Sequence, residues 1–301
     1  MNLQILPSYQ IDTAKWDACV AKSSNGLVYA SSAYLNSMAD NWSGLIINDY
    51  ESIMPLPWRR KWGITYLYTP PFMQQLGLIG NTFLVDENIL KAINKFTKYG
   101  DYFFNFPNKL FPFNGTLSSK CNYILVLSVG YDSIKKGYSN ELNGYLKKVN
   151  IAGLQYKDAN VKDAIDLYQK HYQLRMPHLQ NEDFERYKKL CSILEKEEKA
   201  FAKEVLDKSG NQLAIALFLK DNKRIYNLMP TTLPDGRKQF AMHYLLDNVF
   251  REYEQQQLIF DFEGSDLAGV KKFYEQFGSI NQPYTHWHFN NLPWLLKLIK
   301  H

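Results

Sequence analysis

Cysteine is scarce in this sequence, and its scarcity excludes two common ways of cross-linking a fold. The chain of 301 residues contains three cysteines, Cys19, Cys121 and Cys191, which lie far apart. Three thiols cannot all pair within one chain, and no two are spaced as in the Cys-x-x-Cys motifs of redox and zinc sites. We therefore expect reduced thiols and a cytoplasmic location.

Long hydrophobic runs are also missing. No window of about 18 apolar residues occurs, which is the length that a membrane-spanning helix needs. The first seven residues, MNLQILP, lack the basic start and long apolar run of a secretory signal. The sequence predicts no membrane span and no leader.

Charge of one sign is not in large excess, because 35 Lys and Arg stand against 30 Asp and Glu, a formal net charge of +5. Such a balance is compatible with an anionic ligand, such as a nucleotide or coenzyme A, but does not call for nucleic acid. Only the net charge favours RNA binding as a function, since the sequence has no ladder of alternating basic and aromatic residues.

Apolar residues, by contrast, are plentiful: 46% of the chain is hydrophobic and 15% is aromatic. With a length prior of about 150 residues per domain, this is enough for two domains or one large one. A soft boundary near residue 135, between Gly130 and Gly137, divides the chain into residues 1–135 and 136–301. The first half reads as a mixture of short strands and helices, broken by prolines between residues 55 and 71.

The second half has a clearer pattern of apolar periodicity. It predicts two helices, a meander of three antiparallel strands, and then helix, strand, helix and strand. The ranges are 159–174 and 182–198, then 200–206, 212–219 and 224–228, then 239–254, 258–262, 267–277 and 284–289. The fold class is therefore α/β, with mixed sheets flanked by helices.

Four segments of the second half carry sharper signals. Residues 258–265 read LIFDFEGS, and residues 269–278 read GVKKFYEQFG. Upstream, residues 138–154 begin with Tyr-Ser-Asn and end with Gly-Leu, and His171 and Arg175 lie four apart. These segments resemble the motifs of FemAB-like N-acyltransferases of the GNAT superfamily.

The resemblance implies two GNAT-like units packed side by side, with a substrate cleft between them. The first unit would be degenerate and the second would carry an N-acyltransferase. The donor would be acyl-CoA, another thioester or an aminoacyl-tRNA, and the acceptor a small-molecule or peptide amine. The alternative is a degenerate pair that binds a ligand or partner without turnover. The sequence leaves the oligomeric state undecided.

Two residues are the candidates for catalysis. Acylation of an amine needs a base, and Glu263 follows a strand whose end would partly desolvate its carboxylate. Tyr274, in the following helix, stands where many relatives have Lys and could donate a proton. Asp261 shares a strand face with Glu263 and is a candidate for substrate binding. The simpler interpretation is a solvated sheet face, or a helix cap by Asp261 near Asp266.

A cofactor site is expected where a turn precedes a helix. Arg237 and Lys238 lie just before the predicted helix 239–254, and Gln239 begins it. In GNAT proteins this is where the diphosphate of coenzyme A binds on backbone N–H groups. The glycine-rich pattern of that loop is absent here. A plain Pro-Asp-Gly turn is the alternative interpretation.

Further substrate-binding candidates lie in both halves. His171 and Arg175 would share one helix face and could hold an anion, or simply face solvent. Tyr68, Gln74 and Gln75 lie in an aromatic, proline-broken stretch that would either line a pocket or pack a domain junction. We expect no metal site, because His286 and His288 flank Trp287 without further ligands at a suitable spacing.

Overall fold

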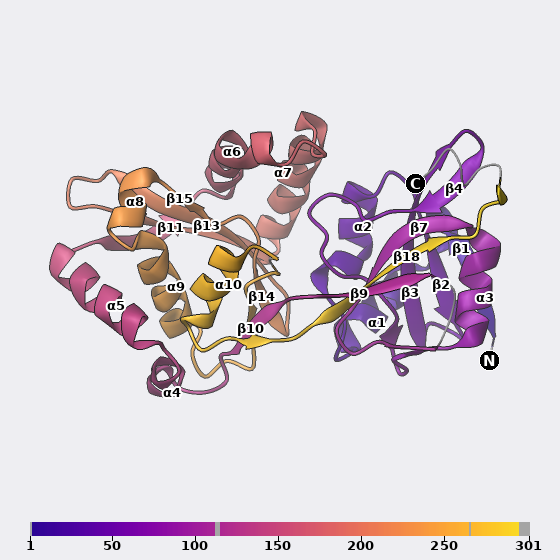
Figure 1. Ribbon diagram of the computed structural model, residues 1–301, viewed down its shortest axis with the longest axis horizontal. Helices are drawn as coiled ribbons and strands as arrows, with labels where there is room; N and C mark the ends of the chain where they lie inside the picture. Colours follow the sequence, from indigo (N-terminus) through magenta and orange to yellow (C-terminus); the bar gives the residue numbers. More distant parts are fainter. Residues whose placement is uncertain (1, 112–114, 265, 295–301) are drawn as a thin grey trace. The chain divides into compact units, whose positions relative to one another are not determined.

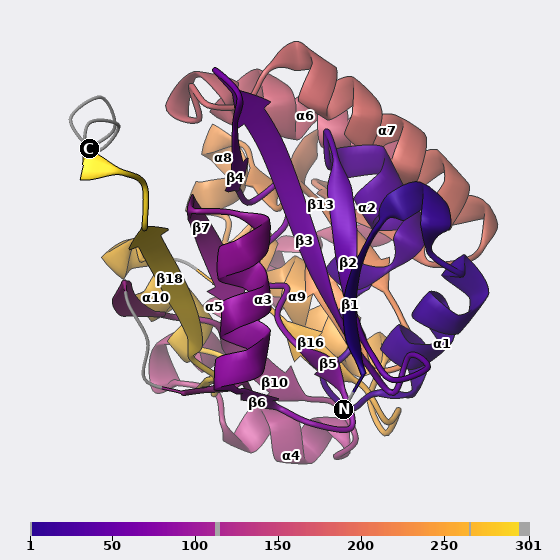
Figure 2. The same ribbon diagram turned by 90° about the vertical axis from the view of Figure 1, so that its right-hand side faces the viewer.

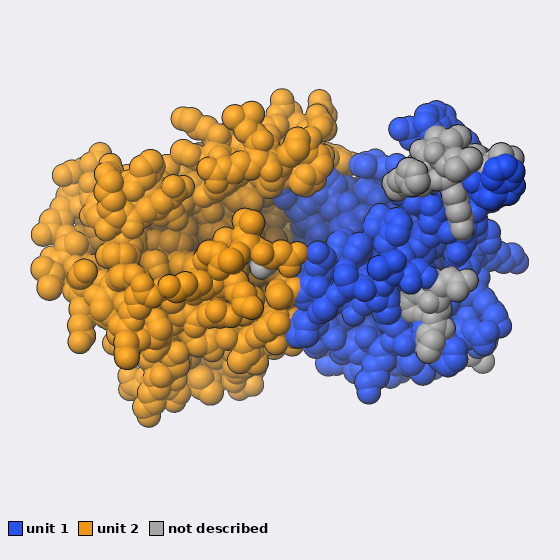
Figure 3. All heavy atoms as spheres, in the orientation of Figure 1, with its two compact units in different colours: residues 1–120, 283–301 blue, residues 121–282 orange. Residues whose placement is uncertain are grey.

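The computed structural model describes residues 2–111, 115–264 and 266–294. Its contacts divide the chain into two compact units (Figures 1 and 3), unit 1 with residues 1–120 and 283–301 and unit 2 with residues 121–282. These limits differ from the predicted division into 1–135 and 136–301 at both ends. The reason is strand pairing, because residues 121–135 begin with a strand of the second sheet and residues 284–290 form a strand of the first.

Unit 1 is a mixed sheet with three helices among its described residues. The helices are α1 Thr13–Lys22, α2 Ser32–Met38 and α3 Glu87–Phe96, with 3-10 turns at Ser8–Gln10 and Val28–Ala30. The strands are β1 Leu3–Pro7, β2 Trp42–Ile47, β3 Ser52–Lys61, β4 Ile64–Leu67, β5 Ile79–Gly80, β6 Leu84–Val85, β7 Tyr99–Phe104, β8 Lys109–Leu110, β9 Thr116–Lys120 and β18 Tyr284–Asn290. In Figure 2, α1 and α2 lie to one side of β2 and β3, and α3 to the other.

The main sheet of unit 1 has the order β1-β2-β3-β4-β7-β18-β9, with β5 also paired to β3. Neighbouring strands are antiparallel except β4 and β7, which are parallel at the single pair Leu67↔Gly100. The core is aromatic and includes Trp16 and Trp287, both fully buried. β18 was expected to close the second sheet, but it lies between β7 and β9 of the first.

Unit 2 is a second mixed sheet. Its strands are β10 Tyr123–Val126, β11 Gln155–Ala159, β12 Ala200–Leu206, β13 Gln212–Lys220, β14 Arg224–Asn227, β15 Thr231–Thr232, β16 Ile259–Asp261 and β17 Ile280–Asn281. Its helices are α4 Tyr131–Lys136, α5 Asn140–Ala152, α6 Val161–Tyr172, α7 Asn181–Lys196, α8 Pro234–Lys238, α9 Ala241–Glu252 and α10 Ala268–Glu275, with a 3-10 turn at Gln173–Arg175. The predicted α/β class is thus confirmed, and so is the meander β12–β13–β14.

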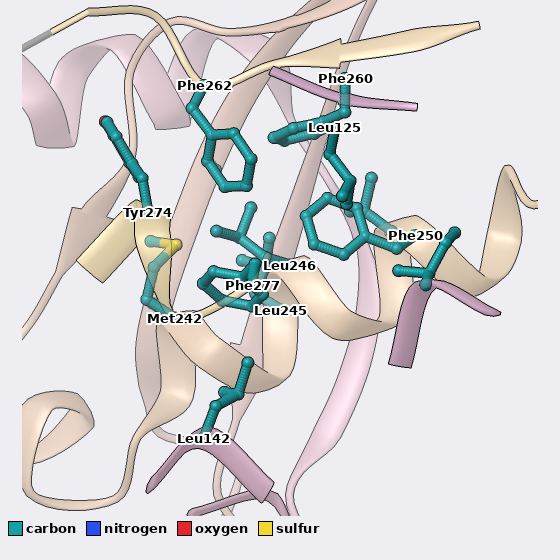
Figure 4. Close-up of a cluster of buried hydrophobic side chains, with 14 of the residues drawn as sticks. Leu125, Leu142, Met242, Leu245, Leu246, Phe250, Phe260, Phe262, Tyr274 and Phe277 are labelled. Carbon is teal, nitrogen blue, oxygen red and sulfur yellow. The ribbon is translucent and has the colours of Figure 1, made fainter. Parts of the chain in front are cut away.

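The sheet of unit 2 has the order β11-β12-β13-β14-β16-β10-β17, with β15 also paired to β13. Residues 213–219 of β13 are all buried, which indicates that both faces of the sheet are covered. On one face, a cluster of apolar side chains joins the sheet to α5, α9 and α10 (Figure 4). Helices α6 and α7 pack together and cover the other face (Figure 1).

Candidate functional site

Two neighbouring parallel strands part in the middle of unit 2. β14 and β16 pair in parallel from Arg224↔Ile259 to Tyr226↔Asp261. The next two residues, Asn227 and Phe262, are no longer paired with each other. Because the strands run in the same direction, their carboxyl ends open at the same edge of the sheet, where α/β proteins commonly bind ligands.

Beyond this point β14 stays attached to its other neighbour through an irregular segment. The backbone N–H groups of Leu228 and Met229 both donate to the carbonyl oxygen of Leu217, at 3.1 and 3.5 Å. Leu228 and Met229 therefore lie opposite the single residue Leu217, as in a β-bulge. The chain then pairs with β13 again through β15, at Thr231↔Ile215. The parting of β14 from β16 is thus built into the strand and does not depend on a loop.

An ion pair closes the base of the opening. The Arg224 guanidinium donates to Asp261 Oδ2 at 2.7 Å, and side-chain exposure is 4% for Arg224 and 2% for Asp261. Asn122 donates to the same carboxyl at 3.2 Å, and Arg224 also donates to Gln282 Oε1 at 2.8 Å. Burial raises the pKa of the Asp261 carboxyl, and the Arg224 charge opposes that shift. Asp261 is therefore engaged inside the protein.

Glu263 lies just outside the strand. β16 ends at Asp261, so Glu263 does not continue the predicted strand face, and its φ is +61°. The Glu263 N–H donates to Asp261 Oδ1 at 3.0 Å, which holds this turn in place. The left-handed residue of this turn is thus Glu263, and Ser265 lies outside the described residues.

Tyr274 of α10 lies within electrostatic reach of Glu263. Its ring is 7% exposed and packs on Phe262, with ring centroids 4.8 Å apart. In Figure 4 its hydroxyl points away from the other labelled side chains. Burial raises the pKa of Tyr274, and the nearby charge of Glu263 raises it further. The structure therefore brings the two predicted catalytic residues together.

A third group in this place was not predicted. Tyr168 of α6 adds to the upward shift of the Tyr274 pKa, so the two phenols lie within electrostatic reach. Burial raises the pKa of Tyr168 itself to about 12. In Figure 3 the surface of unit 2 is hollowed between the regions that Figure 1 labels α6 and α10. Helical spacing alone places Tyr168 on α6 without showing what it faces.

The predicted cofactor residues Arg237, Lys238 and Gln239 lie just before α9. Arg237 and Lys238 belong to the short helix α8, and Lys238 bonds Asp235 at 2.8 Å. Arg237 is exposed and forms no ion pair in the described ranges. Phe240 precedes α9 with φ +54° and gives it no side-chain cap.

The first turn of α9 is accordingly open. The backbone N–H groups of Ala241, Met242 and His243 make no hydrogen bond within the described part of the chain. Such N–H groups at a helix start, with the positive end of the helix dipole, favour an anion. Burial lowers the pKa of His243, which keeps this imidazole neutral near pH 7.

The other predicted substrate residues lie elsewhere. Helix α6 ends at Tyr172, so Arg175 stands in the following 3-10 turn and does not continue the helix of His171. Both side chains are exposed. The Arg175 guanidinium lies 5.7 Å from the centre of the Tyr172 ring.

Three predicted residues lie in unit 1. The Tyr68 hydroxyl accepts from the Asp40 N–H at 2.7 Å, and Gln75 is 1% exposed and accepts from the Phe106 N–H at 3.1 Å. Gln74 accepts from the Gln75 side chain. These contacts belong to the packing of unit 1, and the substrate-binding role of the three residues stays a prediction.

His286 and His288 share one partner. Their ring nitrogens lie 2.9 and 3.0 Å from Asp101 Oδ1. No group of three or more His, Cys, Asp or Glu suited to a metal ion occurs among the described residues. In the same residues, no helix is long and apolar enough to cross a membrane.

Comparison with known proteins gives a match in structure but none in sequence. No family profile matches the chain, and no curated protein does. The solved structure of FemX is similar over 100% of both chains, with 11% identity and a TM-score of 0.66. A conserved protein of unknown function from Bacteroides thetaiotaomicron VPI-5482 is similar over 92% of this chain and 98% of its own, with 12% identity and a TM-score of 0.59.

A tandem GNAT protein from the clavulanic acid biosynthesis pathway is also similar, over 97% of this chain and 99% of its own, with 10% identity and a TM-score of 0.53. Identities this low show the fold alone. The chain therefore has the fold seen in FemX and in the tandem GNAT protein, built from two GNAT-like units.

Proposed function

We propose that the chain is an N-acyltransferase whose chemistry occurs in unit 2, where β14 and β16 part. The observation that carries this proposal is the meeting of Glu263 and Tyr274 at the end of the parted strands. A carboxylate and a protonated phenol within electrostatic reach of each other supply one proton acceptor and one proton donor, which acyl transfer to an amine requires.

The reaction balances with these two groups. The amine nitrogen attacks the carbonyl carbon of a thioester, so that a C–N bond forms and the C–S bond breaks. Glu263 takes the proton that the amine loses. Tyr274 gives its proton to the departing thiolate and regains one from solvent. Its raised pKa keeps Tyr274 protonated at neutral pH, and so able to donate.

Asp261 acts in this proposal through its contacts. It accepts from the Glu263 N–H and is held by Arg224, so it fixes the turn that carries the base. This positions Glu263 on a rigid strand end, as an efficient catalytic group requires. A direct role of Asp261, His171 or Arg175 in binding substrate remains a prediction.

The residues at the start of α9 fit an anionic donor such as acyl-CoA. The open N–H groups of the first turn and the exposed Arg237 would hold a diphosphate, with Lys238 and Gln239 beside them. The coenzyme would supply the activated thioester. An aminoacyl-tRNA would present phosphates to the same place, so the assay includes both donors.

The test compares Glu263→Gln with Glu185→Gln, the same change at an exposed residue of α7. Acyl transfer to a panel of small and peptide amines is followed by release of free thiol, and by amide formation where the donor is an aminoacyl-tRNA. We expect a loss of about 10²–10⁴-fold in kcat for Glu263→Gln, with donor binding retained, and no change for Glu185→Gln. Full activity of Glu263→Gln contradicts the assignment of the base, and no transfer by the wild-type chain contradicts the function.

One observation favours a non-catalytic binding protein as the second candidate. Phe240 occupies the left-handed position before α9 and stacks on Tyr145, with ring centroids 3.9 Å apart. A bulky residue stands there where a glycine-rich loop would let a ligand approach the backbone. If this candidate is right, no thioester raises the melting temperature of the chain and no amine is acylated.

A further inference from the structure

A buried amide side chain lies at the point where the strands part. Asn227 is the last residue of β14, and it is the first residue beyond the β14–β16 ladder. It is 1% exposed, yet neither its Oδ1 nor its Nδ2 has a hydrogen-bond partner among the residues that the structure describes. A buried amide without a partner destabilises a fold, so its presence needs an explanation.

The other buried asparagines among the described residues show what the chain does elsewhere. Asn25 donates to the Leu78 carbonyl at 2.7 Å and accepts from the Gly80 N–H at 3.4 Å. Asn105 donates to the Asn25 carbonyl at 2.9 Å, and Asn122 donates to Asp261. Each has protein partners, so the unpaired state of Asn227 is not a general property of buried asparagines in this chain.

The face of the sheet on which Asn227 lies follows from strand register. Asn227 is paired with Phe218 of β13, and Phe218 and Ile225 belong to the cluster that packs against α9 and α10. Because side chains two apart share a face, Asn227 lies on the same face as Ile225 and as Phe262 across the opening. Tyr274 packs on Phe262. Asn227 thus stands on the side of the opening toward α9 and α10.

We propose that Asn227 binds an amide group of the ligand, donating through Nδ2 and accepting through Oδ1. This inference deepens the proposed acyltransferase function and rests on it. A side-chain amide offers one donor and one acceptor side by side, and another amide complements both. Two ligands of the proposed reaction carry such a group, namely the pantetheine arm of a coenzyme A thioester and a peptide amine.

The matched control is Thr231, which is fully buried and whose hydroxyl likewise has no partner within the described ranges. It is paired with Ile215, an odd number of residues from Phe218, so it lies on the opposite face of the sheet from Asn227. Thr231→Val removes a similar buried polar group without touching the face that we assign to the ligand.

The experiment uses the full chain and four variants or forms: wild type, Asn227→Leu, Asn227→Ala and Thr231→Val. Calorimetric titration measures binding of pantetheine, acetyl-CoA and glycylglycine amide, and thermal melting is recorded without ligand. We expect Asn227→Leu to weaken binding of one amide-bearing probe by at least about tenfold while raising the melting temperature by about 2–4 °C, since an unpaired buried amide is removed. Thr231→Val should leave affinity within about twofold.

The probes separate the two sources of the amide. A loss confined to pantetheine and acetyl-CoA assigns Asn227 to the donor, and a loss confined to glycylglycine amide assigns it to the acceptor. If Asn227→Leu fails to fold, Asn227→Ala gives the affinity measurement in its place. Wild-type affinity in the Asn227 variants, or a wild-type chain that binds none of the probes, overturns this inference alone. The proposed function is overturned when the wild-type chain also transfers no acyl group from a thioester or an aminoacyl-tRNA.

Discussion

The two units have the same strand arrangement, and they differ where a ligand would bind. Reading β1-β2-β3-β4-β7-β18-β9 against β11-β12-β13-β14-β16-β10-β17, each strand has a counterpart, and β5 on β3 corresponds to β15 on β13. In both sheets one neighbouring pair on this path is parallel, β4–β7 and β14–β16. The same framework therefore occurs twice, and any difference in chemistry must come from side chains.

The helices that follow these strands show the first difference. In unit 1, Asp86 caps α3 and accepts from the N–H groups of Asn88 and Ile89, both at 2.9 Å. In unit 2, α9 has no side-chain cap, and Arg237 precedes it. A carboxylate at the start of α3 occupies the N–H groups and repels an anion, whereas the start of α9 is open to one. Of the two units, unit 2 has the helix suited to bind a phosphate-bearing donor.

The buried tyrosines show the second difference. The Tyr102 hydroxyl of unit 1 donates to the Pro55 carbonyl at 2.7 Å and accepts from the Gly77 N–H at 2.9 Å. The Tyr274 hydroxyl of unit 2 has no hydrogen bond in the described part of the chain, and it lies near Glu263. The fold uses both the donor and the acceptor of the Tyr102 hydroxyl, whereas the Tyr274 hydroxyl is available for the role that we propose.

The largest expected effect concerns the ion pair at the base of the opening. Arg224→Met leaves the buried Asp261 carboxyl unpaired and should cost about 3–5 kcal/mol in the free energy of unfolding of unit 2. Replacing both residues, Arg224→Met together with Asp261→Leu, should recover most of this lost stability, because no buried charge remains. The parallel strands of unit 1, which pair at Leu67↔Gly100, likewise have no charged residue at their pairing position.

The two units can be followed separately in that experiment. All six tryptophans lie in unit 1, so their fluorescence reports unit 1 in urea, while circular dichroism reports both units. We expect the circular dichroism transition to move and the fluorescence transition to stay. A shift of both by the same amount would show that the units unfold as one and would break the comparison.

A smaller effect is expected from removing a single phenol. Tyr274→Phe should lower kcat by about tenfold or more at neutral pH, because the leaving thiolate loses its proton donor. Because the pKa of Tyr274 is raised above its usual value near 10, the phenol keeps its proton throughout the neutral range. Wild-type activity should therefore not fall between pH 7 and 9 through deprotonation of Tyr274. Tyr102→Phe is the matched control in unit 1, and it should lower stability but not kcat. Equal kcat in Tyr274→Phe and wild type would remove Tyr274 from the mechanism.

The smallest effects test the two helix starts. Asp86→Ala should destabilise unit 1 by about 1 kcal/mol through loss of the cap, without changing donor affinity. Arg237→Ala should leave stability unchanged and weaken binding of acetyl-CoA by about two- to fivefold, most strongly at low salt. Urea titration and calorimetry check both. Weaker donor binding in Asp86→Ala than in Arg237→Ala would assign the donor to unit 1.

Local patterns predicted much of the fold of unit 2, because its meander and its helices have strong periodicity over ranges close to those observed. The sequence could not predict the pairing of β10 and β18, since each joins a sheet through contacts more than 130 residues away. The same holds for the site. Glu263 and Tyr274 were predicted from adjacent motifs, whereas the Arg224–Asp261 pair, Tyr168 and the unpaired amide of Asn227 depend on which elements become neighbours.

The place of β18 has a consequence for synthesis on the ribosome. It lies between β7 and β9, yet it is translated about 180 residues after β7. At roughly 5–20 residues per second, the nascent chain carries β7 and β9 with no strand between them for about 10–35 s. Unit 2 is continuous in sequence and can be complete before that interval ends. The half without the proposed chemistry is therefore the last to mature, and it is the half that a nascent-chain chaperone would have to protect.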